Sequence, residues 1–198
     1  RNQYNAGDYA ASMLSYTKAE QLIDKIDDEF IKGLLYAQLG MLHQKYYDYP
    51  RSLDAFNTAA KHYELAGKTA HKYFAKLNIG QVYQELKDYT IAEDLLSEVM
   101  SWSYENNYVQ LCQEALEFLI TLYDETDQET KIASITNSIY ADYCGSSLQM
   151  IQIRAFELSK QNNASSINML NEADGQLRHS VDTASHYYYK YRVQKQLG

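Results

Sequence analysis

The chain has 198 residues, of which 45% are hydrophobic and 22% charged, the composition of an ordinary folded protein. Its formal net charge of −8 opposes general binding to nucleic-acid phosphates, which needs Lys and Arg, so we expect no nucleic-acid binding by this segment. No apolar run approaches the ~20 residues that cross a bilayer, and we expect no membrane insertion. One Pro and eight Gly favour long helices joined by short turns.

The dipeptide Asp-Tyr recurs at Asp8, Asp48 and Asp88, an offset of 40 residues each time. A fixed period of this size predicts stacked helical hairpins. Each Asp stands where its carboxylate would cap the free amides of a helix N-terminus. The sequence predicts helices at about 8–24, 28–46, 50–66, 69–86, 89–105, 108–124, 129–143, 147–161, 164–178 and 181–197. They form one array over 1–198, with helix-pair units 8–47, 48–87, 88–127, 128–161 and 162–198.

Each copy of the repeat places small, large apolar and small residues on one helical stripe. In the companion helix a Gly recurs at the same register. Gly inside a helix costs up to about 1 kcal/mol relative to Ala, so we expect the partner helix to pack against the bare backbone there. The positions assigned to this packing are Gly40, Ser52, Phe56, Ala59, Gly80, Tyr83, Ala92 and Leu96.

These columns resemble the tetratricopeptide repeat, which places Leu-Gly and then an aromatic on its first helix and small, aromatic, small on its second. The 40-residue spacing is longer than the usual length of about 34, and no Pro closes a repeat; longer helices account for both differences. The resemblance implies an all-α fold, a right-handed superhelix of about five antiparallel helix pairs that binds a protein or peptide.

Low Pro, high Tyr and long repeats look like the sensory tetratricopeptide segments of bacterial regulators, which precede a membrane anchor and a DNA-binding or kinase output. That likeness implies a place on the cytoplasmic or periplasmic side of an envelope protein. A passive assembly scaffold and a peptide-responsive switch are both compatible with the repeats. Because the chain begins at Arg1 and no polar cap closes either end, we expect it to be a fragment of a longer protein.

In tetratricopeptide arrays the first helix of each pair lines a concave groove that meets the ligand. Family members that clamp the carboxylate of chaperone tails use Lys and Asn at two of these columns, where this chain has Ala37 and Met41, so that clamp is absent. The acidic, partly apolar set favours a ligand with Lys or Arg beside a hydrophobic anchor; a solvated helix face is the alternative. The predicted groove residues are Met41, Gln44, Phe74, Gln81, Gln84, Glu85, Glu114, Glu117, Thr121 and Asp124.

Downstream, the register places Ile132 and Ile139 in the second-helix columns, with Thr136 replacing the large residue. The last helix carries tyrosines at 187–189 and 191 that cannot all face one way. They predict either a homodimer through the C-terminal helix or burial within the chain, and both readings stay open.

Catalytic and metal-binding patterns are absent from the sequence. It contains no Gly-rich phosphate loop, nucleophile elbow or His-x-x-x-His spacing, so we expect no enzyme, no cofactor and no metal. The two cysteines, Cys112 and Cys144, are expected to be buried free thiols. They fall at comparable heights on successive antiparallel helices, however, so a disulfide is geometrically feasible in an oxidising compartment.

Overall fold

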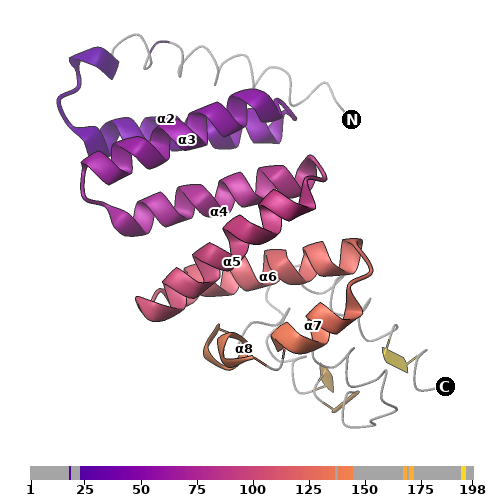
Figure 1. Cartoon of the computed structure of the whole chain (residues 1–198). Coiled ribbons are helices and arrows are strands. Elements are labelled where there is room, and N and C mark those ends of the chain that lie inside the picture. Colours follow the sequence, from indigo (N-terminus) through magenta and orange to yellow (C-terminus); the bar gives the residue numbers. More distant parts are fainter. Residues whose placement is uncertain are drawn as a thin grey trace. The chain divides into compact units, whose positions relative to one another are not determined.

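The structure, a computed structural model, describes residues 18, 23–136, 138–144, 167, 168, 170, 171, 193 and 194. Its elements are a short 3-10 helix η1 (Ile23–Lys25) and the helices α2 (Glu29–Lys45), α3 (Tyr49–Leu65), α4 (Thr69–Glu85), α5 (Tyr89–Glu105), α6 (Val109–Glu125), α7 (Glu129–Thr136) and α8 (Ile139–Cys144) (Figure 1). No strand occurs in the ranges just given. Consecutive helices pack pairwise in a repeating arrangement, so the all-α, solenoid-like expectation is confirmed. The right-handed coiling stays a prediction, as do the helices predicted before residue 23 and after residue 144, which lie outside these ranges.

The chain forms two compact units, residues 1–99 and residues 100–198. The first contains α2, α3, α4 and most of α5, and the second contains the last turns of α5 with α6, α7 and α8. In the first unit α3 packs against both α2 and α4, and α4 also contacts α2. In the second unit α6 contacts α7 and α8.

The 40-residue period has a simple origin in helix length. Each helix from α2 to α6 has 17 residues, and each is followed by a three-residue turn, so helix starts recur every 20 residues. Every turn has the same conformation: its middle residue is left-handed, and the next amide N–H donates to the carbonyl five residues earlier. The left-handed residues are Tyr47, Gly67, Lys87, Asn107 and Asp127, with φ between 54° and 67°. The closing bonds are Asp48 to His43, Lys68 to Tyr63, Asp88 to Tyr83, Tyr108 to Ser103 and Gln128 to Tyr123, at 2.8–2.9 Å.

The glycine of the first complete hairpin receives an aromatic ring, as the repeat pattern suggested. A Cβ built on Gly40 would lie 2.6 Å from Cδ1 of Phe56, a fully buried ring on α3. One turn away, the buried hydroxyl of Ser52 donates to the carbonyl of Gly40 at 2.9 Å. The missing side chain on α2 therefore lets α3 approach closely enough for both a ring contact and an interhelical hydrogen bond.

The same device recurs at other places. At Gly80 the nearest atoms to a built Cβ are Cγ and Cδ2 of Leu96, both at 3.0 Å. Gly33, which the repeat pattern did not single out, faces the ring of Tyr63. A Cβ built on Gly33 would lie 2.7 Å from the Cδ1 and Cε1 atoms of that ring. Three other positions assigned to this packing are covered by neighbouring residues. Ala59 and Ala92 are fully buried, and Tyr83 is half-buried against the cluster that contains Phe56.

The helix predicted over 129–143 is interrupted, and this prediction was wrong in detail. The structure has α7 ending at Thr136 and α8 starting at Ile139. The hydroxyl of Thr136 donates to the carbonyl of Ile132, four residues back, and that of Ser138 donates to Ile135. Such side-chain bonds compete with the helical ladder. Ile139, expected on a buried stripe, is 59% exposed at the start of α8.

Candidate functional site

Helix α2 has one face against α3 and another that is open. Its buried residues, Gly33, Leu39, Gly40 and His43, lie on the packed side. The open side carries Leu34, Gln38, Met41 and Lys45, which share a stripe because they follow one another at intervals of three and four residues. Met41 is 51% exposed, and the stripe is therefore an accessible surface of thioether, aliphatic and polar groups.

Helix α4 repeats this stripe 40 residues later. Phe74, Asn78 and Gln81 are half-buried and Glu85 is exposed. Because α4 contacts α2, the two stripes lie on neighbouring helices of the first unit. The amide of Asn78 donates to the carbonyl of Phe74 at 2.7 Å, one turn back in the same helix.

The carboxylate of Glu85 is held from the neighbouring helix. It accepts a hydrogen bond from the hydroxyl of Tyr49 on α3 at 3.0 Å. Desolvation, followed by the hydrogen bond to Glu85, raises the pKa of Tyr49 above its ordinary value. A neutral Tyr49 therefore donates to Glu85 at neutral pH and orients that carboxylate at the end of the α4 stripe.

One predicted groove position has a different environment from the others. Gln84 is 8% exposed, so its side chain is buried, whereas Gln44 is half-buried like several of the remaining positions. Gln38 and Asn78 belong to the stripes on α2 and α4 but were not among the predicted groove residues. The 40-residue repeat could have identified them, because it relates these two positions to each other.

In the second unit, helix α6 presents an acidic face. Glu114 and Glu117 are half-buried, and Thr121, Asp124 and Glu125 are exposed. Each of the first two carboxylates accepts a bond from a Gln one turn earlier, at 3.0 Å for Glu114 and 3.4 Å for Glu117. These bonds hold the carboxylates along one side of α6, where they can attract a cationic group.

The histidines in the described ranges make structural contacts. Nδ1 of His62 on α3 lies 2.6 Å from a carboxylate oxygen of Glu29 at the start of α2, and its ring stacks on Tyr36. Lys32 also donates to Glu29, at 2.7 Å. The hydrogen bond from Lys32, and then that from His62, lower the pKa of Glu29 below its ordinary value.

Neither a metal centre nor a membrane span is found in the part of the chain that the structure describes. No three His, Cys, Asp or Glu side chains there gather closely enough to hold an ion. Over the same residues, no helix has the length and apolar character needed to cross a bilayer.

Comparison with known proteins gives a family. The family model described as AimR transcriptional regulator-like matches residues 2–198, nearly the whole chain. The matching family is thus a regulator family with hairpin repeats like those of the tetratricopeptide family, rather than the tetratricopeptide family itself. Neither the search of curated proteins nor the search of solved structures found a match.

Proposed function

Because the chain belongs to the AimR transcriptional regulator-like family, we propose that it is the peptide-sensing segment of a transcriptional regulator. Its task in this proposal is non-covalent recognition rather than catalysis. The observation that carries the proposal is the pair of stripes on the neighbouring helices α2 and α4, exposed on α2 and mostly half-buried on α4, which combine apolar and amide side chains.

This mixture of side chains suits an extended peptide. Apolar groups such as Leu34, Met41 and Phe74 can bury an aliphatic or aromatic ligand side chain. The amides of Gln38 and Gln81 can bond the peptide groups that every linear peptide carries. In the second unit, the acidic face of α6 by itself favours ligand segments that carry Lys or Arg.

A direct test screens an array of short synthetic peptides for binding to the full chain. The peptides vary in two features, net charge and the presence of one large apolar residue. We expect binding to peptides with Lys or Arg beside an apolar residue, and weaker binding when the basic residue is replaced by Glu. If no peptide class binds better than scrambled controls, the proposed recognition is wrong.

Substitutions then locate the surface. Met41→Ser should weaken binding of the selected peptide, whereas Leu65→Ser, at an apolar position 73% exposed on α3, should not. Equal losses for the two variants would exclude the α2 stripe. The contact of α6 is tested by charge reversal in the next step.

Charge reversal on α6 has a matched control on α3 and α5. The double variant Glu117→Lys, Asp124→Lys should lower the affinity for a cationic peptide at least about tenfold, because repulsive charges replace attractive ones. The control Asp54→Lys, Asp94→Lys makes the same change in net charge at exposed positions of α3 and α5. Equal effects would show that net charge alone, rather than the α6 face, determines affinity.

A passive assembly scaffold is the alternative function. The family name favours a regulator, in which ligand binding must change the protein. Small-angle scattering of the full chain with and without the selected peptide distinguishes the two functions. A changed radius of gyration on peptide binding supports the switch, and an unchanged scattering curve at saturation supports the scaffold.

A further inference from the structure

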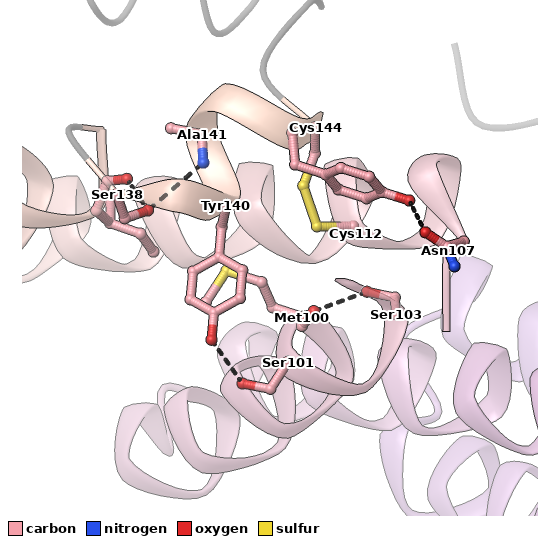
Figure 2. The surroundings of a disulfide bond; sticks show 11 residues. Met100, Ser101, Ser103, Asn107, Cys112, Ser138, Tyr140, Ala141 and Cys144 are labelled. Atoms are coloured by element: carbon pink, nitrogen blue, oxygen red, sulfur yellow. Dashed lines mark hydrogen bonds between the residues drawn. A yellow bond between two sulfur atoms is a disulfide. The ribbon is translucent and has the colours of Figure 1, made fainter. Parts of the chain in front are cut away.

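A disulfide in the second unit joins α6 to α8, contrary to the expectation of two free thiols. The sulfur atoms of Cys112, in the first turn of α6, and Cys144, the last residue of α8, are bonded. Figure 2 shows this bond. Both residues are fully buried, and they are separated by 32 positions in the sequence. No cysteine is left free in the protein. The helical register placed the two at comparable heights, and the broken helix brings Cys144 onto α6.

Apart from the disulfide, α8 makes several contacts with other described residues. The helix has six residues, too few to be stable without tertiary support. Among the side chains described, Ala141 and Cys144 are buried and Ile139 is mostly exposed.

Two half-buried tyrosines, Tyr140 and Tyr143, also attach α8 to described residues of the second unit. Tyr140 and Tyr143 both set their rings edge-on to Tyr104 of α5, with centroids 5.2 and 5.1 Å apart. Tyr140 shares a hydrogen bond with Ser101 at 3.4 Å, and Tyr143 donates to Asn107 at 3.5 Å. Both bonds are at the long limit for such groups and are correspondingly weak.

The start of α8 has a side-chain hydrogen bond of its own. The hydroxyl of Ser138 accepts a bond from the amide of Ala141 at 3.5 Å and also donates to the carbonyl of Ile135 in α7. A six-residue helix with a separate start and one cross-link to α6 can open locally without unfolding the helices that precede it.

From these contacts we infer that Cys112–Cys144 is a reversible redox site, which holds α8 on α6 when oxidised and releases it when reduced. In the reduction a thiolate of a dithiol attacks one sulfur and forms a mixed disulfide. The second thiol of the reagent then displaces the protein sulfur. The dithiol is oxidised to a disulfide. Its two electrons and two protons are transferred to Cys112 and Cys144, which become thiols.

Burial of both sulfur atoms determines how the reaction is controlled. A reductant reaches them only when α8 opens, so the rate of reduction should follow that opening. Release should be local: the turns and glycine contacts that organise α2 to α4 do not involve either cysteine. The inference does not depend on the proposed peptide sensing.

The first test measures thiols and amide exchange in the full chain. Denatured without reductant, the protein should show no free thiol, and two after dithiothreitol treatment. Reduction of the native protein should accelerate amide exchange across residues 139–144 about 100-fold, as expected from removing a cross-link that closes a loop of 32 residues. Exchange in α2 to α4 should stay the same.

Three results would overturn the inference. They are two free thiols in the unreduced protein, equal exchange of α8 in both redox states, and reduction that proceeds only when α6 also loses protection. The last would identify a structural staple. The double variant Cys112→Ser, Cys144→Ser should exchange like the reduced protein and be insensitive to dithiothreitol.

A second measurement uses the native disulfide and needs no cysteine variant. Tyr143→Ser removes one attachment of α8 and should speed reduction by dithiothreitol several-fold. Tyr73→Ser removes a tyrosine of the first unit and should leave the rate unchanged. Equal rates in Tyr143→Ser and the unaltered protein would show that opening of α8 does not control access to the bond.

Discussion

Replacement of Gly40 by Ala is expected to destabilise the protein although Ala is the better helix former. The added Cβ would lie 2.6, 2.7 and 2.8 Å from three ring atoms of Phe56. That ring is fully buried, and its cluster includes Ile79 and Val82 of α4, so it can move only by displacing packed neighbours. Overpacking of this kind costs about 1–3 kcal/mol, while the gain in helix propensity is at most about 1 kcal/mol. With the full propensity gain subtracted, the expected net loss is up to about 2 kcal/mol.

Urea denaturation followed by circular dichroism measures this loss as a lower midpoint with an unchanged slope. Gly80→Ala is the matched control, because its nearest neighbour is the flexible side chain of Leu96 at 3.0 Å, and it should lose less. Combining Gly40→Ala with Phe56→Leu should cost less than the sum of the single changes, since the smaller side chain relieves the clash. A Gly40→Ala protein as stable as the original, or strict additivity in the double variant, would refute the proposed close approach.

Three further predictions concern the turns, the interhelical hydrogen bond and the start of α2. Lys87 is exposed with φ of 63°, so Lys87→Gly should raise the free energy of unfolding by about 1 kcal/mol. Gly67→Lys, at the equivalent turn, should lower it by a similar amount. Calorimetry measures both changes, and no change in either variant would contradict the left-handed turn. Ser52→Ala removes the buried bond to the Gly40 carbonyl and should cost about 1 kcal/mol in urea denaturation, whereas a neutral result would mean that the bond adds nothing. The lowered pKa of Glu29 implies stability that is present above its ordinary pKa of 4.5 and lost as pH falls through the lower folded value. Glu29→Gln should therefore melt below the original protein at about pH 6 and approach it near about pH 3 in a melting series; a constant difference across that range would contradict the ion pair.

The repeated hairpins could be predicted because their cause is local. A helix of 17 residues and a three-residue turn recur with little variation, so Asp48 and Asp88 mark the period directly. The close approach at Gly40 was also readable, since a Gly inside a helix, opposite a large apolar residue of the next one, indicates that the two helices pack tightly. Asp48 does cap α3, accepting a bond from the amide of Arg51.

Which face of a helix is open depends on its neighbours, and the sequence expresses this less clearly. Gln84 is polar and was placed among the groove residues, but α4 packs on α2 and α3, and its side chain is buried. Asn78 was not predicted because an amide in mid-helix carries no signal until the surrounding packing shows it to be near the open stripe. A periodic pattern fixes intervals along a helix but not the rotation of the stripe to within one residue.

The sequence by itself determined the helical class, the hairpin period and the positions where a missing or small side chain lets helices meet, because these follow from spacing within about 20 residues. Only the tertiary structure decided that the helix predicted over 129–143 breaks before Ile139 and that Cys144 is bonded to Cys112. The reason is physical: a helix continues or stops according to a balance of small local terms, and contacts with residues as far away as 32 positions can tip it.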